Sequence, residues 1–195
     1  MKKLLILCAV FLYGCGMQQQ EEARIVIPPR TPFHILLSDT TNHVVGMAIP
    51  IQDKIFVTAD HLLQTYENIF WKGEEIQVLA RDFDNDLLFF TLDRWVGNEA
   101  IWSDSPPVVG SAIFWVDGAE IAEEQVHSIA ELGEDQIKRD VLVLSGTSDV
   151  PNSGSPVFDA TGKIFGVLVG GDMSRKVSFA VRADVVRRIL KESME

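Results

Sequence analysis

Short apolar runs rich in Val, Ile and Phe alternate along the chain with turn-forming Asp, Asn, Gly and Pro. This pattern predicts β-strands, because β-branched and aromatic residues favour extended structure and turn residues bound each run closely. Gly162-Lys163 separates two such runs, as the turn of a hairpin would. Many short strands at close spacing are typical of a barrel or a sandwich. The expected strands are residues 44–51, 54–58, 76–80, 87–92, 112–116 and 141–144.

One segment, residues 183–192, has a clear helical period. Its Val, Ile and Leu residues share one face of a helix, and its basic residues lie on the other face. Asp184 near the start and basic residues near the end of the segment suit the helix dipole. The pattern therefore predicts an all-β protein with a C-terminal helix.

The composition limits the partners of the protein. The chain has 195 residues, of which 47% are hydrophobic, so it can bury a large core as one domain or as two small fused halves. The formal net charge is −11 and no Lys/Arg cluster offsets it, which argues against a nucleic-acid partner. A weak boundary at residues 103–107 separates two β-rich halves, residues 33–102 and residues 103–195.

The N-terminus has the pattern of a targeting segment. Two lysines precede an apolar stretch, residues 4–12, that is too short to span a bilayer. The sequence LYGC that ends at Cys15 is similar to a bacterial lipobox, in which a signal peptidase cuts before the cysteine that carries the lipid. An ordinary cleaved signal peptide is the alternative, and both interpretations place the protein outside the cytoplasm.

The lipobox interpretation assigns residues 1–15 to a lipoprotein signal peptide with its lipidated cysteine, and residues 16–32 to a polar spacer. The protein would then be held in the cell envelope, in the periplasm or on the cell surface, with a lipid at Cys15 as its contact with the membrane. Cys8 and Cys15 are the two cysteines of the chain, so we expect no disulfide in the mature domain. No His/Cys/Asp spacing suits a metal, and no glycine-rich loop suits a phosphate, so we expect no metal and no cofactor.

Three short motifs carry candidate catalytic chemistry. His61 ends the apolar run IFVTADH (55–61), Asp86 precedes a buried-strand pattern in DNDLLFF (84–90), and Ser153 lies in NSGSP (152–156). A serine hydroxyl is a weak nucleophile, so an imidazole must take its proton, and a carboxylate must fix the imidazole tautomer. Asp82 and Asp84 compete with Asp86 for that last role, because residues two positions apart share a face of a strand.

These motifs resemble those of trypsin-like serine proteases, and their order His61, Asp86, Ser153 is the order of that family. Looser matches at residues 101–105, 109–112, 162–167 and 178–181 indicate the HtrA and glutamyl-endopeptidase branch. The resemblance implies a chymotrypsin-like fold of two six-stranded antiparallel β-barrels. The N-terminal barrel, residues 33–102, would hold His61 and Asp86, and residues 103–195 would hold Ser153 and the helix. The chain ends at Glu195, so the resemblance covers no PDZ domain.

Pro151 departs from the family pattern, which has glycine at this position. In the family, the backbone N–H of that glycine and the N–H of the serine form the oxyanion hole. Here Ser153 keeps its donor and Pro151 has none. Two interpretations follow: a serine endopeptidase that acts through an acyl-enzyme, and a catalytically impaired protein whose cleft binds peptides.

The resemblance also implies a substrate site for a polypeptide. Thr147 would lie at the base of the primary side-chain pocket, Val169, Gly170 and Gly171 along one wall, and Val177 near the other. Because Thr147 is not acidic, we expect small or medium apolar side chains there rather than Arg or Lys. Gly170-Gly171 has an alternative interpretation as a simple hairpin.

Other candidate residues receive structural interpretations. His34, His43 and His127 lack a catalytic neighbourhood, so we expect them to be structural or surface residues. Residues 24–27 superficially resemble a zymogen activation site. Asn152 cannot form the ion pair that such activation needs, so we expect these residues to be spacer or a first strand.

Overall fold

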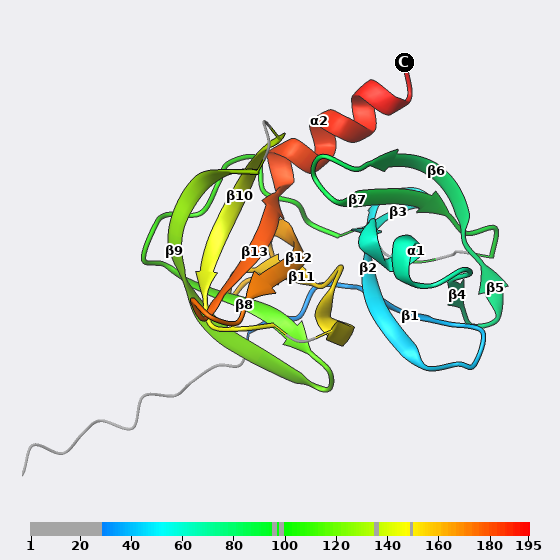
Figure 1. Cartoon of the computed structure of the whole chain (residues 1–195), viewed down its shortest axis with the longest axis horizontal. Helices are drawn as coiled ribbons and strands as arrows, with labels where there is room; N and C mark the ends of the chain where they lie inside the picture. The colour runs from blue at the N-terminus through cyan, green and yellow to red at the C-terminus, as the bar shows by residue number, and fades with distance from the viewer. Residues whose placement is uncertain (1–28, 95–96, 98–99, 135–136, 149) are drawn as a thin grey trace, which may run out of the picture.

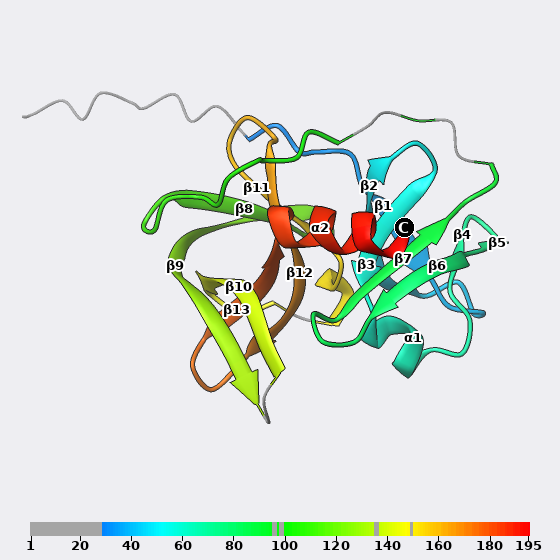
Figure 2. The ribbon, with the colours of Figure 1, turned by 90° about the horizontal axis from the view of Figure 1, so that it is seen from above.

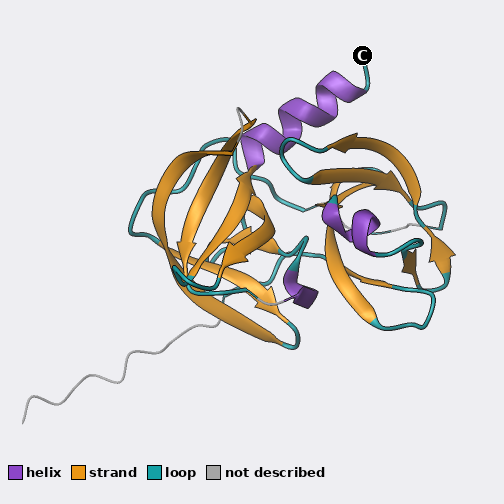
Figure 3. Ribbon diagram, viewed as in Figure 1, coloured by secondary structure: helices purple, strands orange, loops and turns teal. Residues whose placement is uncertain are grey.

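A computed structural model of the chain describes residues 29–94, 97, 100–134, 137–148 and 150–195. Strands make up most of the regular structure in this described part, and two α-helices and a 3-10 turn complete it (Figure 3). The strands form two antiparallel sheets that lie side by side (Figure 1). The expected all-β class is therefore confirmed.

The N-terminal half is a seven-stranded sheet with the order β5-β4-β1-β2-β3-β7-β6. We expected six strands closed into a barrel. In the described residues this sheet does not close into a barrel. Two of its strands form a tight hairpin, whose turn places Lys72 and Gly73 at positive φ and which is too short to give a sequence pattern. The strands are β1 (Ile35–Ser38), β2 (Val44–Gln52), β3 (Ile55–Ala59), β4 (Phe70–Trp71), β5 (Glu74–Glu75), β6 (Gln77–Asp82) and β7 (Leu87–Thr91).

The C-terminal half is a closed six-stranded antiparallel barrel, as expected, with the order β10-β13-β12-β11-β8-β9. Its longest strand, β9, was not among the predicted strands. The inward face of β9 has small and polar residues beside the buried Val126, so it lacks an apolar alternation. The strands are β8 (Ala112–Asp117), β9 (Glu120–Glu134), β10 (Ile137–Ser145), β11 (Pro156–Phe158), β12 (Ile164–Asp172) and β13 (Val177–Arg182).

The C-terminal helix α2 (Ala183–Ser193) lies where its periodicity predicts, and it runs across both halves of the molecule (Figure 2). Its apolar face is buried, and Asp184 lies in its first turn, where a carboxylate suits the helix dipole. The hydrogen bond from Arg182 to Asp184 is the main cause that holds the pKa of this carboxyl below its ordinary value. A second helix, α1 (His61–Thr65), is too short to show a helical period.

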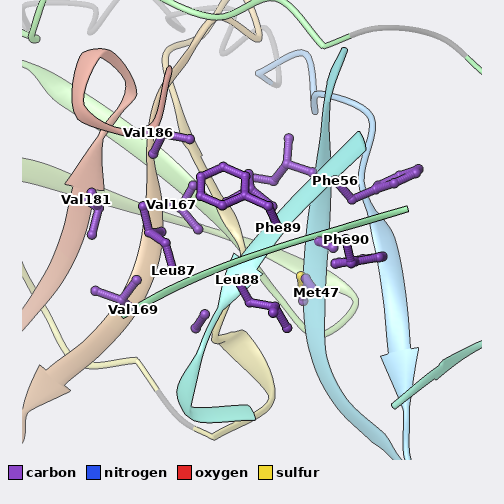
Figure 4. Close-up of a cluster of buried hydrophobic side chains, with 14 of the residues drawn as sticks. Met47, Phe56, Leu87, Leu88, Phe89, Phe90, Val167, Val169, Val181 and Val186 are labelled. Carbon is purple, nitrogen blue, oxygen red and sulfur yellow. The ribbon is translucent and has the colours of Figure 1, made fainter. Parts of the chain in front are cut away.

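The larger hydrophobic core joins the two halves. Leu87 and Phe89 of β7 extend toward Val167 of β12 and Val186 of α2, and all four side chains are buried (Figure 4). Trp102, in the connection between the halves, donates from Nε1 to the Pro50 carbonyl at 3.1 Å and is buried. At roughly 25 cal/mol per Å² of buried apolar surface, this shared core stabilises the halves against each other and fixes residues on their boundary.

Several sequence predictions lie outside the described residues, namely the lipobox with Cys15, the spacer before residue 29 and the segment 24–27. Within the described ranges, no helix combines the length and apolar character that crossing a membrane requires.

Candidate active site

The structure brings His61, Asp86 and Ser153 together at the boundary between the two halves. The imidazole Nε2 of His61 lies 2.8 Å from Ser153 Oγ, and Nδ1 lies 2.7 Å from Asp86 Oδ2. The backbone N–H of His61 also donates to Asp86 Oδ1, at 2.7 Å. Both carboxylate oxygens of Asp86 thus orient His61, and the other imidazole nitrogen faces the hydroxyl of Ser153.

Strand pairing explains why His61 and Asp86 meet. Strands β3 and β7 are antiparallel, and Ala59 at the end of β3 lies opposite Leu87 at the start of β7. His61 follows β3 by two positions and Asp86 immediately precedes β7, so the register brings them to the same end of the sheet. The backbone N–H of Asp60 donates to the Asp86 carbonyl at 3.1 Å and extends this contact.

The turn before β7 selects Asp86 over its two neighbours. Asp86 has φ of 57°, a left-handed conformation that Asp and Asn adopt more readily than most residues. Asp82 turns its carboxylate to the backbone N–H and the side-chain amide of Asn85, both at 3.0 Å, and Asp84 is exposed. Asp82 therefore stabilises the turn, and Asp86 alone of the three contacts His61.

Backbone contacts from both halves hold the Ser153 turn. The N–H of Met47 in β2 donates to the Ser153 carbonyl at 2.8 Å, and the N–H of Gly154 donates to the Leu168 carbonyl in β12 at 2.7 Å. Gly154 has φ of 82°, and a Cβ at this position would collide with the Met47 carbonyl and the Thr58 hydroxyl. The glycine is thus required, and Ser153, 8% exposed, cannot shift freely.

Pro151 lies in the 3-10 turn η1 (Val150–Asn152), directly before Ser153. It has no N–H to offer an oxyanion. The i to i+3 geometry of a 3-10 turn directs the Val150 carbonyl toward the N–H of Ser153, the remaining expected donor. Of the two expected oxyanion donors, the N–H of Ser153 is therefore the one that remains.

Asn152 is 1% exposed and anchors the same turn to the β8–β9 hairpin. Its Nδ2 donates to Asp117 Oδ1 at 3.0 Å, whereas its Oδ1 has no partner among the described residues. The sequence motifs gave no signal for Asp117, because it lies outside all three of them.

An ion pair with a buried carboxylate lies next to His61 in the chain. The Asp60 side chain is fully buried, and its Oδ1 lies 2.6 Å from Nε of Arg81 in β6. Burial raises the pKa of the Asp60 carboxyl, but hydrogen bonds from Arg81 and Gln64 outweigh this effect and hold it below its ordinary value. The same hydrogen bond raises the pKa of Arg81, so the pair stays ionised across neutral pH.

The residues expected to bind substrate lie on β12, at the start of β13 and in the segment after β10. Gly170 and Gly171 belong to β12, opposite Phe179 and Ser178 of β13, and the hairpin turn comes later, at residues 173–176. β11 pairs with β12 only as far as Val167. Beyond Leu168, in the described residues, the other edge of β12 has no strand partner, and such an edge can pair with an extended peptide.

The other residues expected to line the substrate site differ in exposure. Thr147 is exposed and Val177 is half-buried, whereas Val169 is buried in the larger hydrophobic core (Figure 4). The Ser178 hydroxyl is buried and donates to the Gly146 carbonyl at 3.0 Å. A Cβ added at Gly171 would lie 3.0 Å from the Val177 carbonyl in the paired strand β13, so a larger residue would crowd this strand pair.

The other histidines have separate contacts. His34 Nδ1 lies 3.1 Å from the Pro32 carbonyl, and His43 Nδ1 lies 2.9 Å from the Thr41 hydroxyl. His127 is exposed on β9. Across the residues that the structure describes, no group of three His, Cys, Asp or Glu side chains is arranged to hold a metal.

No known family profile matches the sequence, and no curated protein sequence matches it. The fold does match solved structures of HtrA-type proteases. The protease AlgW with a tripeptide has a TM-score of 0.71 at 16% identity, over 85% of this chain and 61% of AlgW. A serine-to-alanine mutant of Rv3671c from M. tuberculosis H37Rv, in its inactive form, has a TM-score of 0.68 at 17% identity, over 85% of this chain and 96% of that one.

The serine endoprotease from Yersinia pestis has a TM-score of 0.65 at 14% identity, over 84% of this chain and 63% of the endoprotease. The chain thus spans about three fifths of AlgW and of the Yersinia enzyme. At these identities the likeness concerns the fold. The chain has the chymotrypsin-like fold of HtrA-type serine proteases, as its motifs predicted.

Proposed function

We propose that the protein is a serine endopeptidase that hydrolyses polypeptides through Ser153, His61 and Asp86. The continuous hydrogen-bonded series from Asp86 through His61 to Ser153 Oγ is the observation that supports this proposal most directly. The fold shared with HtrA-type proteases supports it further. A nucleophile, a base within hydrogen-bond distance and an orienting carboxylate are the groups that acyl transfer from a peptide requires.

In the proposed reaction, Ser153 Oγ attacks the peptide carbonyl carbon while His61 Nε2 takes the hydroxyl proton. His61 then gives this proton to the leaving amine as the C–N bond breaks, which leaves an acyl-enzyme on Ser153. A water molecule loses a proton to His61 and attacks the ester carbon. The bond to Ser153 Oγ then breaks, which releases the acid, and His61 returns its proton to Oγ and so restores the serine. Asp86 accepts the Nδ1 hydrogen bond throughout and stabilises the imidazolium that forms.

The second candidate function is peptide binding without efficient turnover, and the turn at Pro151 favours it. Loss of one oxyanion donor typically costs about 10²- to 10³-fold in turnover, or about 2.7 to 4 kcal/mol. An open β12 edge can still pair with an extended peptide when turnover is slow. The two candidates share the binding site and differ in whether Ser153 reacts.

A fluorophosphonate probe distinguishes the two candidates. We expect Ser153 Oγ to displace fluoride and form a bond to phosphorus, because His61 can accept the serine proton. Labelling should fall on acidification, since a protonated imidazole cannot act as the base. Intact-mass measurement followed by peptide mapping locates the adduct.

His61→Ala should lose this labelling, whereas the matched variant His43→Ala should keep it, because His43 contacts Thr41 rather than Ser153. An adduct that forms equally in both variants, or on residues other than Ser153, contradicts the proposal. Absence of any adduct together with saturable peptide binding supports the binding function.

We also propose that a lipid at Cys15 holds the protein in the cell envelope, outside the cytoplasm. The lipobox-like sequence that ends at Cys15 supports this location. The full-length protein expressed in a bacterium should partition into the detergent phase, and Cys15→Ser should move it to the aqueous phase. Equal partitioning of the two proteins contradicts the anchor and leaves an ordinary signal peptide as the better interpretation.

A further inference from the structure

We propose that Asp60, Arg81 and Gln64, hereafter the clamp, are positioning residues that hold His61 against Asp86. This inference rests on the proposed function, because it assigns the clamp a role in the same reaction. None of the three residues touches the reacting atoms. They act through the backbone segments that carry His61 and Asp86.

The contacts of Asp60 occupy both of its carboxylate oxygens. Arg81 Nε donates to Oδ1 at 2.6 Å, and Arg81 Nη2 and Gln64 Nε2 donate to Oδ2 at 3.0 Å and 2.8 Å. The carboxylate is fully buried, so its end of these charge-assisted bonds is shielded from water, whereas the Arg81 side chain is 32% exposed. Such a two-point Arg–Asp contact fixes direction as well as distance, which a single point charge does not.

The position of Asp60 in the helix indicates that its side chain has another role than capping. Asp60 is the N-cap residue of α1, and an aspartate at this position usually accepts a bond from an N–H of the first turn. Here its side chain makes no such bond, and it accepts hydrogen bonds from Gln64 of α1 and from Arg81 of β6 instead. The carboxylate therefore connects α1 to the sheet.

The order of the strands explains how this connection sets the active-site geometry. β7 lies between β3 and β6, with Leu88 paired to Thr58 on one side and to Arg81 on the other. Asp60 follows β3 and Arg81 lies in β6, so their ion pair crosses from one side of β7 to the other. The crossing lies close to the start of β7, which Asp86 immediately precedes. The N–H of Asp60 also donates to the Asp86 carbonyl at 3.1 Å. Asp60 is thus attached to Asp86 through its backbone and to β6 through its side chain, one residue before His61.

Arg81 is itself held in place. Its guanidinium carbon lies 4.6 Å from the centre of the Phe83 ring, in the turn that leads to Asp86. The clamp thus contacts this turn, the strand before it and the helix that begins with His61. Loss of the clamp should let α1 and the turn move relative to each other, and a misplacement of about 1 Å can cost on the order of 100-fold in rate.

The main test is the double variant Asp60→Asn/Arg81→Gln, which removes both charges and leaves no unpaired buried carboxylate. We expect kcat for peptide hydrolysis to fall by about 10- to 100-fold with KM unchanged, because alignment and not substrate binding is lost. Circular dichroism at the assay temperature establishes that the variant is folded. Arg81→Lys keeps the charge but not the two-point contact, so its kcat should lie between those of the wild type and the double variant.

The chain offers a matched control in the Arg182–Asp184 pair at the start of α2, which also makes two hydrogen bonds from the guanidinium to the carboxylate. Asp184→Asn/Arg182→Gln should leave kcat unchanged. A folded clamp variant with wild-type kcat overturns the inference. An equal loss of kcat in both double variants overturns it as well, since the effect would then be general.

A second measurement does not depend on hydrolysis. The Nδ1–H proton of His61 should give a downfield NMR resonance in the wild type, because it donates to Asp86, and this resonance should shift or broaden in the clamp variant. An unchanged resonance overturns the inference. If the wild type hydrolyses nothing but the resonance responds as expected, the proposed function fails while the positioning of His61 by the clamp stands.

Discussion

Ser153→Ala is expected to abolish peptide hydrolysis and to leave the fold intact. The Ser153 hydroxyl makes its hydrogen bond to His61 Nε2, whereas backbone groups of Met47, Gly154 and Leu168 hold the turn and stay in place. Removal of the nucleophile in a serine protease costs up to about 10⁶-fold in kcat, so turnover should fall to the detection limit. Hydrolysis of an unfolded protein, followed by gel electrophoresis and mass spectrometry, measures this effect.

Ser105→Ala is the matched control, because Ser105 is an exposed serine outside the site. It should keep full activity. If Ser153→Ala hydrolyses the substrate at the same rate as the wild type, another group or a contaminant does the cleavage. The cleavage sites of the wild type also test the proposed preference, which we expect to be small or medium apolar side chains before the broken bond, with no enrichment of Arg or Lys.

Much of the fold could be predicted because its strongest patterns are local. The helix expected at residues 183–192 is α2 (Ala183–Ser193), and the strand expected at residues 44–51 is β2 (Val44–Gln52). α2 buries one face, and β2 buries six of its nine residues, so the apolar pattern of each segment follows its burial. β9 could not be found in this way, because closure of the barrel orders it although its inward side chains are mostly small or polar.

The residues of the candidate site could be predicted from the sequence where they lie in a recognisable motif. His61, Asp86 and Ser153 each lie in a recognisable motif, and the structure brings all three together. The choice of Asp86 over Asp82 and Asp84 depends on the left-handed conformation of Asp86 itself. The local pattern of apolar residues does not encode this conformation.

Asp60 and Arg81 were missed for a related reason. Their contact joins residues 21 positions apart through the order of the strands, and each residue alone resembles an ordinary surface charge. The burial of Asp60 is a property of the folded sheet, and it becomes visible only once the position of β6 beside β7 is known.

Pro151→Gly is expected to raise kcat by about 10²- to 10³-fold, which is the usual contribution of one oxyanion donor. Glycine restores an N–H at this position. Its wider conformational range also lets the peptide between Val150 and residue 151 rotate, so that the Val150 carbonyl can turn away from the N–H of Ser153. The price is a small loss of stability, about 0.4 to 1 kcal/mol, because glycine adds freedom to the unfolded chain. Steady-state hydrolysis and thermal unfolding measure the two effects.

Pro151→Ala separates the two contributions of glycine. Alanine also restores the N–H but has a narrower conformational range, so a gain in both variants assigns the effect to the donor. A gain in Pro151→Gly alone assigns it to rotation of the turn. If neither variant is faster than the wild type while fluorophosphonate still labels Ser153, the oxyanion site does not limit the reaction. If neither variant hydrolyses peptide and Ser153 stays unlabelled, restoring the donor does not make an enzyme of this site, and peptide binding at the open edge of β12 becomes the better account of the protein.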